Sequence, residues 1–180
     1  MGDGPLLVCY DGSDGARAAL EAAAKQLDHG EAIVACYWQP FAESAKRFAV
    51  NILELVQDPA SVNAREEELA QRVADEGEAF ARELGLDAEG RAVRIDSPID
   101  EAILAHAEEI DAAGIVLGAR SRSSIRSLIL GDVANEVVQR ATRPVFVVPS
   151  KDLARRRRVE LTRDDADARD DAARNAGRAV

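Results

Sequence analysis

The chain is 180 residues long, which suffices for one domain with a hydrophobic core but is short for two. Apolar residues make up 47% of it and aromatic residues only 4%, a composition that favours a parallel sheet covered by helices over a β-sandwich. The formal net charge of −10 argues against nucleic acid as a partner, because polyanion binding draws on clustered Lys and Arg.

The sequence shows no sign of a membrane-bound or exported protein. It contains no long apolar run, signal peptide or lipidation motif, so we expect a cytoplasmic protein that does not engage membranes. Its two cysteines, Cys9 and Cys36, each lie inside an apolar run. We therefore expect buried free thiols rather than a disulfide.

The first forty residues predict a strand, a helix and a second strand. Residues 6–11 form a short apolar run that leads into Asp-Gly-Ser-Asp-Gly, a series of turn and helix-cap residues. The helix that follows ends at His29-Gly30, and residues 32–38 are continuously apolar, as in a buried strand. In the predicted helix, apolar residues recur at helical spacing: Ala16, Ala19, Leu20, Ala23 and Leu27.

The middle of the chain is harder to interpret. Between Pro40 and Pro59, four apolar residues indicate a short amphipathic helix: Phe48, Ile52, Leu55 and Val56. Residues 62–84 predict a long helix that stops at Gly85. Its core-facing residues are Leu69, Val73, Phe80 and Leu84. A short strand is predicted next, at residues 92–95.

The remaining elements repeat the alternation of strand and helix. Ser97 is the predicted cap of a helix that has Pro98 as its first residue, and residues 114–118 predict the fourth strand. An Arg/Ser-rich loop follows, Gly131-Asp132 opens another helix, and residues 144–149 predict the fifth strand. The inward residues of the two helices are Ile99, Ile103 and Ile110 in the first, and Val133, Val137, Val138 and Ala141 in the second.

Five alternations of strand and helix predict one fold class. It is a single α/β domain with a doubly wound, five-stranded parallel sheet of the Rossmann-like type. Ligands of such sheets bind outside the carboxyl ends of the strands, where the strand order reverses. Two segments should meet there, namely the turn at Asp11 and the loop from Gly118 to Asp132.

We expect the domain to span residues 1–150 and a charged tail to span residues 151–180. The tail is rich in Arg, Asp and Ala and has too few apolar residues to fold alone, so it is either a solvated helix or disordered. Residues 155–158 are four consecutive arginines that could dock on an acidic surface or on nucleic acid. Seven acidic residues elsewhere in the tail offset most of that charge.

Several coordinated motifs carry a resemblance to a known family. They are Asp11-Gly12-Ser13 after the first strand, Pro-Ile-Asp-Glu-Ala-Ile at 98–103, Gly118-x2-Ser121-x9-Gly131-Asp132, and Arg-Pro-Val-Phe-Val-Val at 143–148. In this order and spacing, residues 5–150 resemble the universal stress protein family. The resemblance implies an adenine-nucleotide α-hydrolase-like fold and a role in the stress response. It also implies regulatory protein partners, which the sequence does not identify. It also implies homodimers that pair through the last strand, here Val145, Phe146, Val147 and Val148.

The better-known members of that family bind ATP or AMP. By correspondence, Asp11 would contact the nucleoside, and Cys9, Tyr10 and the backbone of Tyr37 would flank the base. Asp11 can equally be a helix cap and turn former. The full candidate nucleotide site is Cys9, Tyr10, Asp11, Tyr37, Leu117, Gly118, Arg120, Ser121, Gly131, Asp132, Val133 and Ala134.

The phosphate part of this site has its own physical logic. A glycine at a strand end lets a loop approach phosphate closely, and a helix that opens at Gly131 points its positive end there. The family pattern is similar to Gly-x2-Gly-x9-Gly-Ser/Thr. This chain keeps both outer glycines but has Ser121 for the middle glycine, Asp132 for the closing hydroxyl residue, and Ala134 where a second hydroxyl is common.

Asp132 is the departure that matters most. At about 4 Å two like unit charges repel by roughly 4 kcal/mol at an effective dielectric near 20, which could cancel the hydrogen bonds of the phosphate cradle. Arg120, Arg122 and Arg126, or a Mg²⁺ ion held between Asp132 and a triphosphate, could offset this repulsion. The alternative is that Asp132 merely caps a helix beside an empty pocket.

Two functional hypotheses follow, and neither is an enzyme. The first is a dimeric stress-response regulator that binds ATP or AMP, and the second is a dimeric interaction module that has lost nucleotide binding. The Walker, His-x-Gly-His and Ser-Gly-Gly-x-Asp-Ser signatures are all missing, although slow ATP hydrolysis is left open. No spacing of His, Cys and Asp predicts a metal site, and we expect His106 to be structural and His29 to be solvated.

Overall fold

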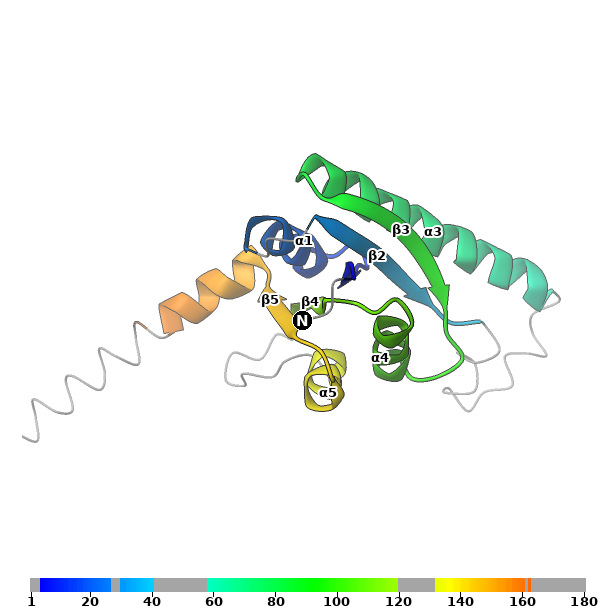
Figure 1. Ribbon diagram of the computed structural model, residues 1–180. Helices are drawn as coiled ribbons and strands as arrows, with labels where there is room; N and C mark the ends of the chain where they lie inside the picture. Colours follow the sequence, from blue (N-terminus) through cyan, green and yellow to red (C-terminus); the bar gives the residue numbers. More distant parts are fainter. Residues whose placement is uncertain (1–3, 27–29, 41–57, 120–131, 161, 163–180) are drawn as a thin grey trace, which may run out of the picture. The chain divides into compact units, whose positions relative to one another are not determined.

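The computed structural model describes residues 4–26, 30–40, 58–119, 132–160 and 162 (Figure 1). Contacts within the chain separate a unit of residues 1–150 from a unit of residues 151–180. Three predicted features lie outside the described residues: the amphipathic helix near Phe48, most of the loop after Gly118, and all but the start of the tail. Each unit is considered by itself below.

The sheet of the first unit confirms the predicted fold class. Its strands are all parallel and lie in the order β3-β2-β1-β4-β5. The bounds are β1 (Leu6–Cys9), β2 (Glu31–Trp38), β3 (Asp87–Arg94), β4 (Gly114–Ala119) and β5 (Val145–Pro149). The strand order reverses at β1, which pairs with both β2 and β4.

Helices cover the two faces of the sheet in pairs (Figure 1). One pair is α1 (Asp14–Gln26) and α3 (Pro59–Glu83), and the other is α4 (Ile99–Glu109) and α5 (Asp132–Arg140). Side chains alternate along a strand, so Val8 packs toward α1 and α3 whereas Leu7 packs toward α4 and α5. The result is two apolar layers separated by one sheet, as expected of a doubly wound domain.

Two residues fix the turn after β1, and each accepts a different hydrogen bond. Ser13 Oγ accepts a hydrogen bond from the Ala16 amide at 3.2 Å, so Ser13 is the residue that caps α1. The Asp11 carboxylate instead accepts from the Ser13 amide at 3.1 Å, which makes Asp11 a turn former and not the helix cap. Gly12 between them has a φ of 75°, a conformation that glycine adopts without strain.

Helix α3 lies closer to the sheet than its large apolar residues indicate. A Cβ added to Gly77 would lie 2.7 Å from both the Tyr10 ring and Val34, so only glycine fits there. The residues it buries are small and mostly four apart: Ala70, Ala74, Gly77 and Ala81. The prediction that Leu69 faces the core is wrong, because its side chain is 49% exposed, whereas Val73, Phe80 and Leu84 pack at the margin of the core.

The start of α3 and the extent of β3 also differ from the predictions. Asp58 accepts hydrogen bonds from the amides of Ala60 and Ser61, so the helix begins at Pro59 rather than at residue 62. It stops before Gly85, as predicted, where φ is 92°. Strand β3 starts at residue 87 rather than 92 because it pairs with β2 along its whole length, from Asp87 opposite Glu31 onward. The first half of β3 was not predicted because its sequence is polar, as is typical of an edge strand.

Two corrections concern α4 and α5. Ser97 does not cap α4, because Pro98 occupies the N-cap position with a ψ of 142° and no side chain caps the helix there. In α5, Val137 is fully buried but Val138 is 47% exposed, so the predicted inward position of Val138 is wrong. Adjacent residues of a helix point about 100° apart, and this short helix buries only a narrow stripe.

The described part of the tail is a helix over residues 151–160. Of the two alternatives for the tail, helix is therefore the one found for its first ten residues. In the part of the chain that the structure describes, no helix is both long enough and apolar enough to cross a bilayer.

Candidate functional site

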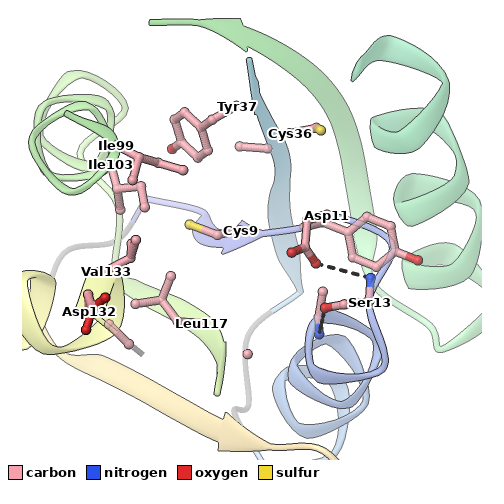
Figure 2. A pocket seen from close by; sticks show the side chains of 15 residues that line it. Cys9, Asp11, Ser13, Cys36, Tyr37, Ile99, Ile103, Leu117, Asp132 and Val133 are labelled. Carbon is pink, nitrogen blue, oxygen red and sulfur yellow. Dashed lines mark hydrogen bonds between the residues drawn. The ribbon is translucent and has the colours of Figure 1, made fainter. Parts of the chain in front are cut away.

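A pocket of about 250 Å³ opens at the carboxyl ends of β1, β2 and β4, where the strand order reverses (Figure 2). This is the position at which doubly wound sheets bind ligands. Its size lies just below the range for small-molecule sites, roughly 300–1,000 Å³. The lining residues are Cys9, Tyr10, Asp11, Ser13, Ala16, Ala35, Cys36, Tyr37, Ile99, Ile103, Leu117, Gly118, Asp132, Val133 and Ala134.

Every candidate nucleotide-binding residue that the structure describes lines this pocket. Arg120, Ser121 and Gly131 lie outside the described residues. The structure thus brings the turn after β1 and the start of α5 to one cavity, while their contact with a nucleotide stays a prediction. The predicted residues found together are Cys9, Tyr10, Asp11, Tyr37, Leu117, Gly118, Asp132, Val133 and Ala134.

Sequence reasoning missed six lining residues, namely Ser13, Ala16, Ala35, Cys36, Ile99 and Ile103. Two of them carried a usable signal. Ile99 and Ile103 were predicted on the inner face of α4, and that helix begins at the same edge of the sheet at which the pocket opens. An inward residue in the first turn of such a helix therefore serves both the core and the pocket.

Gly118 is required by packing as well as by any ligand. A Cβ at this position would lie 2.6 Å from the carbonyl oxygen of Gly15 and 2.7 Å from the Ala16 amide nitrogen. Both are backbone atoms of α1, so no side-chain rotation could relieve the clash. The glycine near the end of β4 lets α1 lie directly against that strand beside the pocket.

The charged side chains in the described lining are Asp11 and Asp132, and both are acidic. Asp132 is the first residue of α5, so its carboxylate lies at the positive end of that helix. The Asp11 carboxylate turns back toward the Ser13 amide at the opposite side of the cavity (Figure 2). Two carboxylates at one pocket favour ligands that offer hydroxyl or cationic groups over bare anions.

Tyr10 forms the wall of the pocket on the α1 and α3 face. Its hydroxyl donates a hydrogen bond to Glu76 of α3 at 3.1 Å. Glu76 also pairs with Arg17 of α1, whose guanidinium lies 5.2 Å from the centre of the Phe80 ring. Burial raises the pKa of Tyr10 to about 12, although the nearby Arg17 opposes the shift. The Tyr10 hydroxyl therefore stays neutral and acts as a donor.

Tyr37 forms the wall on the α4 and α5 face. Its hydroxyl lies 2.9 Å from His106 Nδ1, and the two rings meet edge to face at 80°. Burial raises the pKa of Tyr37 and lowers that of His106, so both groups are neutral at pH 7. His106 is buried, with 7% exposed, and hydrogen bonded to Tyr37, whereas its expected structural role stays a prediction.

The two cysteines are free thiols, as expected. Burial raises the pKa of Cys9 to about 12, and a hydrogen bond with Tyr37 partly opposes that rise. Burial likewise raises the pKa of Cys36 to about 11. The thiolate is the reactive form, so both side chains serve as small apolar surfaces in the pocket wall. Among the residues that the structure describes, no group of three or more His, Cys, Asp or Glu side chains is placed to hold a metal ion.

Comparison with known proteins agrees with this fold. Residues 4–149 match the model of the universal stress protein family. A universal stress protein from Archaeoglobus fulgidus is 25% identical, with a TM-score of 0.59, over 80% of this chain and 97% of its own. The sequence matches no curated protein.

Two similar structures contain nucleotides. One is the universal stress protein from Archaeoglobus fulgidus in complex with dAMP, which is 20% identical, with a TM-score of 0.56, over 82% of this chain and 99% of its own. The other is a universal stress protein in complex with cAMP, which is 23% identical, with a TM-score of 0.53, over 84% of this chain and 100% of its own. The family model covers most of the chain, so this protein belongs to the universal stress protein family.

Proposed function

We propose that this protein binds an adenine nucleotide, ATP or AMP, in the pocket at the carboxyl ends of β1, β2 and β4 and acts as a stress-response regulator rather than an enzyme. The observation that carries the proposal is the pocket itself. It lies at the reversal of the strand order, and the predicted site residues that the structure describes line it. Relatives with bound dAMP and cAMP support the ligand class.

The lining offers a partner for each part of an adenine nucleotide. Ile99, Ile103 and Leu117 give the base an apolar wall. The Asp11 carboxylate lies at the strand end, where it can accept hydrogen bonds from ribose hydroxyls. The first amides of α5 would meet the phosphates. The nucleoside part of the ligand fits this lining well.

The phosphate part fits less well, and this favours a second candidate function. Asp132 places a carboxylate at the N-terminal end of α5, where phosphate would bind. The clash at Gly118 shows that this glycine has a packing reason to be there without any ligand. An interaction module that no longer binds nucleotide would have both features. Under the first proposal, Mg²⁺ between Asp132 and a triphosphate would relieve the repulsion.

Isothermal titration calorimetry with ATP and AMP, each with and without Mg²⁺, separates the two candidates. The first predicts saturable one-to-one binding and a gain from Mg²⁺ that is larger for ATP than for AMP. No heat at high micromolar ligand under all four conditions would leave the interaction module as the function.

We further propose that the protein is a homodimer paired through β5. This strand is an edge of the sheet, and its residues from Val145 to Val148 are only partly buried within the chain. An apolar edge with unpaired backbone groups is a template for pairing with a second copy. Sedimentation at tens of micromolar should show a dimer, and a Val147→Lys substitution should shift it toward monomer. A wild-type monomer at that concentration would refute the pairing.

A further inference from the structure

We infer that His106 is a positioning residue that acts on the pocket through Tyr37, and that protonation of His106 weakens binding of the adenine ligand. His106 does not itself line the cavity, but its hydrogen bond at 2.9 Å holds a side chain that does. The affinity part of this inference rests on the proposed function, whereas the coupling between His106 and the pocket can be measured in the free protein.

The direction of the hydrogen bond between Tyr37 and His106 depends on which ring nitrogen carries the proton. We assign the proton of neutral His106 to Nε2, so that Nδ1 accepts the hydrogen bond from the Tyr37 hydroxyl. The Cys9 thiol, which lines the pocket, interacts with the same hydroxyl. Cys9, Tyr37 and His106 then form a chain of interacting groups that runs from the pocket wall to α4. The hydrogen bond to His106 holds the hydroxyl of Tyr37 in place.

Protonation of His106 changes these interactions. Protonated imidazole donates from both nitrogens and accepts from neither. The Tyr37 hydroxyl would have to accept from Nδ1 and turn its own proton toward the Cys9 sulfur, which is a weak acceptor. The new charge would also sit where His106 is 7% exposed. Both effects favour movement of the ring or of α4 toward water.

This movement also affects the cavity. His106 and Ile103 lie three residues apart on α4, so they are neighbours on one face of the helix. Ile103 and Ile99 line the pocket beside Tyr37 and Cys9, and the four side chains gather on one side of it (Figure 2). Any shift of α4 that hydrates His106 therefore moves one wall of the pocket.

Two charged groups tune His106 in opposite directions. Burial is the main cause that lowers the pKa of His106, Glu109 on the same helix raises it, and Arg91 on β3 lowers it. The other titratable groups that face it are Tyr37 on β2 and, through Tyr37, Cys9 on β1. Both are neutral over the range in which histidine titrates, so the response belongs to His106.

The test begins with the free protein. The chain has two histidines, so a His106→Asn variant identifies the ring signals of His106 by nuclear magnetic resonance. The titration runs from about pH 8 to about pH 5.5, within the range in which histidine changes charge and above the sequence pI of about 4.8. We expect the backbone amides of Cys9 and Tyr37 to shift with the midpoint of His106. Amides that ignore that midpoint would overturn the positioning role.

Paired variants then test the sign of the coupling. Glu109→Gln should move the His106 midpoint to lower pH, and Arg91→Gln should move it to higher pH. If the pocket responds to His106, the pH at which the Cys9 and Tyr37 amides shift should move in the same two directions. A purely structural histidine would leave those amides unmoved. Amide midpoints that stay fixed in both variants would contradict the inference.

The last arm measures affinity with adenosine, which lacks the phosphate group that titrates near pH 6. We expect wild-type affinity to fall roughly fivefold across the range, at the lower end of typical couplings between two sites. The His106→Asn variant, whose amide oxygen can replace Nδ1, should bind with little pH dependence. A wild-type affinity that is constant with pH would overturn the inference. No binding of adenosine or AMP at any pH would instead refute the proposed function, and the amide titration would still decide the coupling.

Discussion

The two faces of the sheet hold their tyrosines in different ways. Tyr10 is tied to Glu76, a half-exposed carboxylate within an ionic cluster, whereas Tyr37 is tied to His106, a buried imidazole. Water can replace a lost partner at the exposed site but not at the buried one. For loss of the tyrosine hydrogen bond, the face of α1 and α3 is therefore the tolerant side of the pocket, and the face of α4 and α5 is the sensitive one.

The largest effect should come from the contact between β4 and α1 at Gly118. Gly118→Ala should lower the free energy of unfolding by about 1–3 kcal/mol or more, because the new methyl group meets only backbone atoms of α1. Urea unfolding measures this loss. Gly30→Ala is the matched control, since an added Cβ meets nothing within 4 Å there. Equal stability of the two variants would mean that α1 does not lie against β4 as described.

The next largest effect should fall on the sensitive face. Tyr37→Phe should cost about 1–3 kcal/mol of unfolding free energy, because it leaves Nδ1 of the buried His106 without its partner. The substitution keeps the ring and removes one oxygen, so thermal or urea unfolding isolates the hydrogen bond. A neutral result would show that water reaches His106.

Asp132 tests the electrostatics of the same face. Asp132→Ser should tighten ATP binding about tenfold, or about 1.4 kcal/mol, by removing a negative charge from the phosphate end of the pocket. The gain should be larger at low salt, where charges are less screened. Glu136→Ser is the control, because this exposed residue of α5 does not line the pocket. Calorimetry that finds unchanged or weaker ATP binding in Asp132→Ser would contradict the electrostatic account.

The smallest effect should fall on the tolerant face. Tyr10→Phe should cost only about 0.5–1.5 kcal/mol, the typical net value of one hydrogen bond, because Glu76 keeps Arg17 and reaches solvent. Measured beside Tyr37→Phe under the same conditions, it gives the comparison directly. A larger loss for Tyr10→Phe than for Tyr37→Phe would reverse the ranking of the two faces.

The parallel sheet could be predicted from the sequence because its buried strands have a recognisable composition. Buried strands such as residues 32–38 are continuous apolar runs, and Gly85 marks a helix end. Strand β3 was half missed because an edge strand carries polar residues that satisfy no periodic pattern. The core face of α3 was misread because close packing selects Ala and Gly, which carry little hydrophobic signal, over Leu69.

The site was predictable as far as it is local in sequence. The turn at Asp11 and the start of α5 could be assigned to one cavity because carboxyl ends of parallel strands converge. The pairing of Tyr37 with His106 could not, since the two residues are 69 positions apart and nothing in either segment marks the other. Contacts between a strand and a distant helix depend on register, and register is settled only by the whole sheet.

The central claim is that the cavity at the carboxyl ends of β1, β2 and β4 takes an adenine ligand. Titration of the labelled protein with AMP, followed by backbone amide chemical shifts, tests it most directly. We predict saturable shifts concentrated at Cys9, Asp11, Tyr37 and Gly118, all of which line the pocket. Shifts that do not saturate, or that cluster away from these strand ends, would contradict the claim.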